Sequence, residues 1–191
     1  MKKLALGLVV LLFLGSASLA AAYSLQISPA SQTVFQNDHA VFNVNVSGAS
    51  GIGGYDFTLL FDSSILANPT VSFGSLLGAP DNSIPIQFPA TGSIEAYEVS
   101  MIPPADLLFS QPANFTLFTL DFLATGIGTS RIAFDSIILS DVNGDPIRNF
   151  VTTGGEITVE AGQVVVPEPG TMLLLGIGLA GLAAYRRKFR I

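Results

Sequence analysis

The chain has 191 residues, a formal charge of −6 and no cysteine. Six of its eight basic residues lie near the two ends, so residues 23–169 hold two basic and fourteen acidic residues, a formal charge of −12. Such a surface repels phosphate backbones, which argues strongly against nucleic acid as a partner. The absence of cysteine excludes disulfides, and about 147 residues between the two ends suffice for one domain stabilised by its own core.

The N-terminal segment has the order of a secretory signal. Lys2 and Lys3 precede an apolar stretch from residue 4 to 14, and the small residues 20–22 follow as a site for signal peptidase. We therefore expect residues 1–22 to be a signal peptide and the remainder to be exported.

After this segment, apolar and polar residues alternate with a period of two, as in Phe42, Val44 and Val46. Short stretches of this kind are separated by Gly, Pro, Asn and Asp. The predicted strands are 24–28, 32–35, 42–46, 55–61, 70–73, 84–88, 93–101, 114–124, 130–134, 136–139 and 155–159. No stretch predicts a long amphipathic helix. The pattern predicts an all-β sandwich with Greek-key or jelly-roll connections.

Several phrases of this region, residues 25–160, are similar to those of cohesin domains. A Gly-rich turn, Gly51 to Gly54, leads into a strand that ends Leu60-Phe61-Asp62-Ser63-Ser64-Ile65-Leu66. Later phrases that fit the resemblance are Phe118-Thr119-Leu120-Asp121-Phe122, Gly126-Ile127-Gly128-Thr129, Asp141-Val142-Asn143-Gly144-Asp145 and Gly155-Glu156-Ile157-Thr158-Val159.

The resemblance implies a jelly-roll β-sandwich of about nine strands over residues 23–160 and a non-catalytic role, such as docking a dockerin-like protein. A carbohydrate-binding module is a related sandwich and stays open as an alternative. On the strand 93–101, Glu95, Tyr97 and Val99 share one side, and we expect them to contribute to a binding patch.

One loop contains oxygen ligands at alternating positions, Asp141, Asn143 and Asp145, as in the first half of a Ca²⁺-binding loop. Pro146 and Thr152 stand where a complete loop of this type needs Gly and Glu. The alternative is a tight Asn143-Gly144 turn capped by Asx side chains, with no ion. We predict Ca²⁺ as a cofactor only on the first interpretation.

The chain offers little for catalysis. His39 is the only histidine. It follows Asp38 in sequence, and we expect it to be a solvated loop residue. Glu95 and Glu98 are close in sequence, but residues three apart on a strand point to opposite faces. We therefore predict that the protein is not an enzyme. The triplets 45–47 and 114–116 match N-glycosylation sites, and we interpret their Asn and Thr as the solvent-facing side of two strands.

The C-terminal segment consists of a linker, 161–166, followed by Pro167-Glu168-Pro169, an apolar stretch and the basic residues Arg186, Arg187, Lys188 and Arg190. The two prolines keep the preceding chain extended. The apolar stretch predicts a transmembrane helix over about 170–185. The basic residues predict a cytoplasmic C-terminus by the positive-inside rule.

The order of these features over 167–191 resembles the PEP-CTERM sorting signal. The resemblance implies processing near Pro167, Glu168 and Pro169 by an exosortase of a Gram-negative bacterium, after a transient stay in the inner membrane. It also implies delivery to the cell envelope, the cell surface or the extracellular matrix. An uncut C-terminal anchor is the alternative.

Two functions follow. The first is a cohesin-like module that holds a protein partner through one sheet face. The second is a component of the matrix that associates with exopolysaccharide. The absence of Trp and the presence of only three tyrosines in residues 23–169 argue against sugar binding by aromatic stacking.

Overall fold

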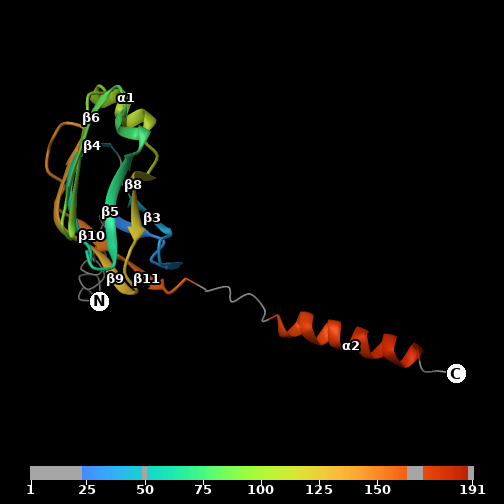
Figure 1. The fold of residues 1–191 in the computed structure, drawn as a ribbon. Coiled ribbons are helices and arrows are strands. Elements are labelled where there is room, and N and C mark those ends of the chain that lie inside the picture. The colour runs from blue at the N-terminus through green and yellow to red at the C-terminus, as the bar shows by residue number, and fades with distance from the viewer. Residues whose placement is uncertain (1–22, 49–50, 163–169, 189–191) are drawn as a thin grey trace, which may run out of the picture. The chain divides into compact units, whose positions relative to one another are not determined.

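The computed structural model describes residues 23–48, 51–162 and 170–188 (Figure 1). The chain divides into two compact units, residues 1–160 and residues 161–191. The signal peptide predicted over 1–22 lies outside the described residues, as does most of the predicted linker.

The described residues of the first unit lie mainly in strands. Their bounds are β1 (Tyr23–Ser28), β2 (Ser31–Phe35), β3 (His39–Ser47), β4 (Ile52–Leu60), β5 (Leu66–Phe73), β6 (Ser83–Ala90), β7 (Ser93–Ser100), β8 (Asn114–Ala124), β9 (Gly128–Asp141), β10 (Phe150–Thr153) and β11 (Gly155–Glu160). A short 3₁₀ turn, η2 (Ser75–Leu77), precedes β6, and a short helix, α1 (Pro104–Ser110), precedes β8.

The strands form two sheets that pack face to face, as a jelly-roll sandwich does. The five-stranded sheet has the order β10-β1-β3-β8-β5, and the six-stranded sheet has the order β2-β11-β9-β4-β7-β6. The chain passes from the five-stranded sheet to the six-stranded sheet at two places. It does so between β1 and β2, at Pro29, and again between β10 and β11, at Gly154. If each of these pairs is counted as one interrupted strand, the described sandwich has the nine strands that were expected.

Three local predictions differ from the structure. The strands predicted over 130–134 and 136–139 are one strand, β9, because the interruption at Asp135 is only a bulge opposite Thr58 and Leu59. Strand β10 was missed because it forms only by parallel pairing with the distant β1. Helix α1 was missed because its seven residues are too few to show a helical period, although Pro104 fits the first turn of a helix.

The core lies between the two sheets. Its largest side chains are phenylalanines that alternate with outward polar residues, and Phe42 and Phe122 from the five-stranded sheet meet edge to face at 6.5 Å. Tyr55 of β4 stacks on Phe118 of β8 with ring centroids 5.4 Å apart, which joins the two sheets. Every buried hydrophobic residue of this core falls between Leu25 and Val159. We therefore expect the sandwich to fold without the flanking segments.

Two phrases of the cohesin resemblance have clear structural roles. Gly53 in β4 lies so close to the backbone of β9 that a Cβ atom would collide with the carbonyl oxygen of Asp141. After β4, Asp62 Oδ1 accepts hydrogen bonds from the Ser64 amide at 2.8 Å and from the Ser64 hydroxyl at 2.6 Å. These bonds cap the turn into β5 and lower the pKa of the Asp62 carboxyl.

The second unit contains helix α2 (Thr171–Lys188), which confirms the helix expected over about 170–185. Its expected membrane span is not confirmed, since no helix in the described part of the chain has the length and apolar character to cross a membrane. The helix has eighteen residues and ends in Arg186, Arg187 and Lys188, which leaves only the residues up to Tyr185 for the apolar stretch.

Candidate functional site

The outer surface of the six-stranded sheet carries an exposed group of apolar side chains. Strand β6 alternates Ile84, Ile86 and Phe88 with Pro85 and Gln87. The first three face solvent with exposed fractions of 48, 37 and 56%. They pair with Val99, Tyr97 and Glu95 of β7, in that order. Together, these six residues form a strip of neighbouring side chains two strands wide.

This strip continues over the next two strands. Asp56 of β4 pairs with Tyr97 on one side and with Ile138 of β9 on the other. Ile138 is 58% exposed. Thr58 of β4 pairs in the same way with Glu95. We call the resulting surface the apolar face, defined by nine residues: Asp56, Thr58, Ile84, Ile86, Phe88, Glu95, Tyr97, Val99 and Ile138.

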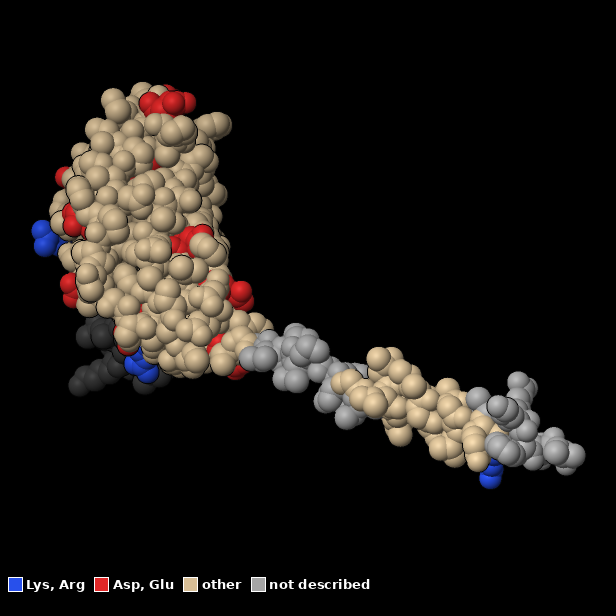
Figure 2. All heavy atoms as spheres, in the orientation of Figure 1, with Lys and Arg blue, Asp and Glu red and all other residues tan. Residues whose placement is uncertain are grey.

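The apolar face carries two carboxylates, Asp56 and Glu95, and no basic residue among its nine members. Acidic side chains are scattered over the visible surface of the sandwich (Figure 2). Of the two basic residues of residues 23–160, Arg131 forms an ion pair with Glu156 at 3.6 Å, toward the other end of β9. Arg148 borders the apolar face beyond Ile138, where both residues line a small hollow. The nine residues of the apolar face therefore combine exposed apolar side chains with a net negative charge.

The residue between Tyr97 and Val99 points the other way. Glu98 is fully buried between the sheets, as expected from its spacing of three from Glu95. Its carboxylate accepts hydrogen bonds from the Ser83 hydroxyl at 2.7 Å and the Tyr55 hydroxyl at 3.0 Å. Burial raises the pKa of Glu98, and the hydrogen bonds from Ser83, Tyr55 and the Ala79 amide offset part of that effect. Burial and the nearby Glu98 carboxylate also raise the pKa of Tyr55.

The outer surface of the five-stranded sheet is mostly polar, and several of its side chains hydrogen-bond to one another. The Thr116 hydroxyl donates to Asn45 Oδ1 at 2.7 Å, and the Thr119 hydroxyl donates to Asn43 Oδ1 at 2.8 Å. The two triplets that match glycosylation sites supply the first of these pairs, as their interpretation as solvent-facing strand residues predicts. His39 begins β3, and its Nδ1 lies 2.7 Å from Asp121 Oδ1 on the same exposed surface. The histidine is therefore paired with Asp121 rather than with Asp38.

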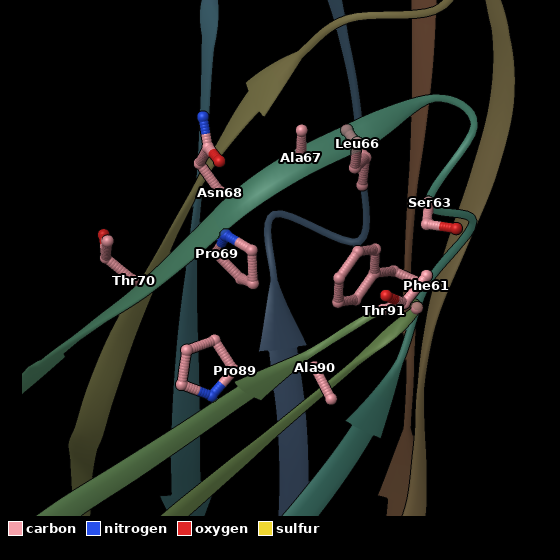
Figure 3. A pocket seen from close by; sticks show the side chains of 11 residues that line it. Phe61, Ser63, Leu66, Ala67, Asn68, Pro69, Thr70, Pro89, Ala90 and Thr91 are labelled. Carbon is pink, nitrogen blue, oxygen red and sulfur yellow. The ribbon is translucent and has the colours of Figure 1, made fainter.

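A pocket of about 580 Å³ opens at the side of the sandwich, where the edge strand of one sheet faces the edge strand of the other (Figure 3). Its walls come from the turn between β4 and β5, from β5 itself, and from the end of β6 with the turn into β7. We call it the edge pocket, and it is lined by Phe61, Ser63, Leu66, Ala67, Asn68, Pro69, Thr70, Pro89, Ala90, Thr91 and Gly92. None of these residues is charged.

The loop predicted to bind Ca²⁺ is a capped turn. Asp141 Oδ1 accepts hydrogen bonds from the amides of Asn143 at 2.8 Å and Asp145 at 2.9 Å. The Gly144 amide bonds to the carbonyl of Asp141, and Gly144 has a φ of +85°. Among the described residues, no three His, Cys, Asp or Glu side chains are grouped to hold a metal. This geometry favours the ion-free alternative, and Ca²⁺ binding by Asp141, Asn143 and Asp145 stays a prediction.

The predicted sorting residues Pro167, Glu168 and Pro169 lie outside the described residues, as does Arg190. Arg186, Arg187 and Lys188 end helix α2, and their anchoring role stays a prediction. Sequence reasoning placed Glu95, Tyr97 and Val99 on one side, which is confirmed, but it missed Ile84, Ile86 and Phe88. Their alternation with Pro85 and Gln87 was the signal that could have found them.

Comparisons with known proteins agree with the predicted sorting signal and with the fold of the sandwich. Residues 165–188 match the model of the PEP-CTERM protein-sorting motif. The motif indicates export and sorting to the cell envelope. No curated protein has significant sequence similarity to the chain.

The sandwich has the fold of cohesin domains. A type II cohesin domain from the cellulosome of Acetivibrio cellulolyticus superposes with a TM-score of 0.62 at 15% identity, covering 71% of this chain and 95% of that one. The sixth cohesin of scaffoldin B from the same organism, solved in complex with a Cel5 dockerin, gives 0.61 at 19% identity and covers 73 and 99%. A non-cellulosomal cohesin from the archaeon Archaeoglobus fulgidus gives 0.58 at 15% identity and covers 74 and 93%.

Proposed function

We propose that the protein is an exported, non-catalytic module that docks a protein partner through the apolar face of its six-stranded sheet. The observation that carries this proposal is the alignment of Ile84, Ile86 and Phe88 on an edge strand beside Tyr97 and Val99. Solvent-exposed apolar side chains in one contiguous strip are typical of interaction sites. Aromatic anchors such as Tyr97 near the middle of a patch often dominate binding energy.

The partner is a protein that presents an apolar surface with basic residues beside it. Asp56 and Glu95 lie within the face, and residues 23–169 have a formal charge of −12, so a basic partner is steered toward it and an acidic one is repelled. Several of the similar cohesins were solved as complexes with dockerins. By analogy of fold, a dockerin-like protein is the partner class we propose.

The sorting motif adds the place of action. In this proposal, signal peptidase removes residues 1–22, and an exosortase processes the chain near Pro167, Glu168 and Pro169. The sandwich is then delivered to the cell surface or the extracellular matrix of a Gram-negative bacterium. A partner bound there would be retained at the envelope.

The proposal is tested with residues 23–162 immobilised in three forms: wild type, the double variant Ile86→Ala/Tyr97→Ala, and Val41→Ala. Val41 is the matched control because it is 45% exposed on a strand of the opposite sheet. Each form is challenged with the secreted proteins of the host. We expect wild type and Val41→Ala to retain the same discrete protein, with basic residues at its binding surface, and the double variant to lose it. Equal retention by all three forms would refute docking through this face.

A further inference from the structure

We infer that the docked protein also covers the α1 end of the sandwich, where the Phe109 side chain inserts into an apolar pocket of that protein. The inference rests on the proposed docking through the apolar face and extends it. Its basis is a second group of exposed apolar side chains, Met101, Leu108 and Phe109, with exposed fractions of 66, 50 and 94%. We call these three residues the end cluster. They lie in helix α1 or just before it, at the end of the sandwich that is uppermost in Figure 1.

The apolar face is too small to be the whole contact surface of a stable complex. It spans the four strands β6, β7, β4 and β9 and the length of residues 84–88. Strands lie about 4.8 Å apart and rise about 3.4 Å per residue, so this surface covers roughly 300 Å². A standard interface buries about 800 Å² on each partner. The partner must therefore contact residues beyond the apolar face.

The two ends of the apolar face differ in the residues that continue it. Met101 follows Val99 on the same side of the chain. Its amide donates to the Asn82 carbonyl at 2.8 Å, which extends the pairing of β6 with β7 by one step. At the other end, the next row of paired residues offers one large apolar side chain, Leu60, which is 42% exposed. The larger continuation of the apolar surface is therefore the one toward α1.

Leu108 connects the end cluster with β9. The position that a Cβ atom of Gly51 would occupy lies 2.5 Å from Leu108 Cδ2 and 2.8 Å from Val142 Cγ1, so these two side chains pack beside each other. Val142 directly follows β9, the strand that contributes Ile138 to the apolar face. The end cluster is thus reached from the apolar face along two strands, β7 through Met101 and β9 through Val142.

Helix α1 is held firmly by the residues on either side of the exposed pair. Leu107 is buried, and so is Gln111 directly after the helix. The Gln111 side chain accepts a hydrogen bond from the Ile52 amide at 2.7 Å and donates to the carbonyls of Ile52 at 2.9 Å and Leu76 at 3.1 Å. Phe109 is therefore presented to solvent on a fixed backbone. An aromatic side chain held in this way loses little conformational freedom on binding, which favours its use as an anchor.

A membrane is the competing occupant of these exposed apolar side chains, and charge argues against it. Residues 97–111 contain Glu98 and Asp106 but no basic residue, and residues 23–169 have a formal charge of −12. Anionic lipids repel such a surface, whereas the basic partner proposed above is attracted to it. The same charge opposes contact between two copies of the chain.

The test places the photo-crosslinker p-benzoylphenylalanine at one position of residues 23–162 at a time, namely 109, 86 or 60. Each form is irradiated with the secreted proteins of the host, and the adducts are identified by mass spectrometry. We expect positions 86 and 109 to give adducts of the same protein. Position 60, the matched control at the other end of the apolar face, should give none. With that protein purified, Phe109→Ala should weaken binding about tenfold, and Leu60→Ala should leave the affinity unchanged.

The three positions separate this inference from docking itself. An adduct at position 86 with none at 109, an equal yield at 60 and 109, or an unchanged affinity of Phe109→Ala overturns the inference and leaves docking through the apolar face. The absence of an adduct at position 86 overturns both. An adduct between two copies at position 109 overturns the inference in favour of self-association. Binding of wild type but not of Phe109→Ala to vesicles of phosphatidylethanolamine and phosphatidylglycerol overturns it in favour of a membrane.

Discussion

The two outer surfaces of the sandwich differ in how their side chains are satisfied. On the five-stranded sheet, Asn and Thr side chains hydrogen-bond to one another across β3 and β8. On the six-stranded sheet, Ile84, Ile86 and Phe88 have cross-strand neighbours on one side only, because β6 is the edge strand. The polar side chains of the first surface are satisfied by one another and by water, whereas a partner that covers the apolar face lowers the free energy by removing apolar surface from water. Both sheets contribute buried side chains to the core, so the difference between them lies in their outer surfaces.

The largest expected effect is on partner binding. Replacement of Ile86 and Tyr97 by Ala removes two side chains near the middle of the apolar face, at about 1–2 kcal/mol each. We expect the affinity for the docked protein to fall about 100-fold, measured by surface plasmon resonance with the partner in solution. Val41→Ala should stay within about twofold of wild type. A comparable loss for Val41→Ala would mean that the polar sheet contributes to the interface.

A smaller effect is expected on the stability of the sandwich when the hydrogen bond between Tyr55 of β4 and the buried Glu98 of β7 is removed. Tyr55→Phe removes one hydrogen bond to the Glu98 carboxylate and leaves that buried group with one donor fewer. We expect a loss of about 1–2 kcal/mol in the free energy of unfolding, measured by urea denaturation at pH 7. Tyr23→Phe is a control at a half-buried tyrosine. If Tyr55→Phe were as stable as wild type, the Glu98 cluster would not be stabilised by this bond.

The same acid predicts a pH dependence. The pKa of Glu98 is raised in the folded state, so the stability that its neutral form contributes is present at about pH 4 and is lost as the pH rises through the raised pKa. Glu98→Gln cannot ionise, and we expect it to be about 1 kcal/mol more stable than wild type at pH 8 and nearly equal at pH 4. Thermal unfolding of both proteins over this range measures the difference. An unchanged difference between pH 4 and pH 8 would contradict the assignment.

On the polar sheet, the effect of a substitution should be small. Thr119→Val removes an exposed hydrogen bond to Asn43 and keeps the shape of the side chain. We expect a change of about 0.5 kcal/mol or less in the free energy of unfolding and no change in partner binding. Loss of partner binding in this variant would mean that part of the interface lies on the outer surface of the five-stranded sheet.

The smallest effect is expected for Ca²⁺. Asp141 Oδ1 already accepts hydrogen bonds from two backbone amides. We therefore expect the melting temperature to be the same with chelator and with about 5 mM Ca²⁺, a concentration near the dissociation constants of the weakest extracellular sites. A rise of several degrees that is absent in Asp145→Ala would instead establish the predicted site.

Much of the fold could be predicted because alternation is a local signal. The pattern of Phe42, Val44 and Val46 reports one buried face without any knowledge of the neighbouring strands. Strand β10 depends on pairing with β1 more than 120 residues earlier, and its short sequence carries no comparable alternation. The bulge at Asp135 looked like a strand end because the period of two is interrupted there.

The candidate site was predicted only in part for the same reason. Glu95, Tyr97 and Val99 were placed on one side by spacing alone. That they lie beside Ile86 and Ile138 depends on how four strands pair in register. The spacing of residues within a single strand does not predict this register. The edge pocket likewise depends on two edges from different sheets that meet at the side of the sandwich.

The most direct test of docking through the apolar face is hydrogen exchange of the purified complex against the free sandwich. We predict slower exchange of the amides in residues 84–88 and 95–99 on partner binding, and no change in residues 39–47 and 114–121. Protection confined to the second pair of segments would contradict the account, because it would place the partner on the polar sheet.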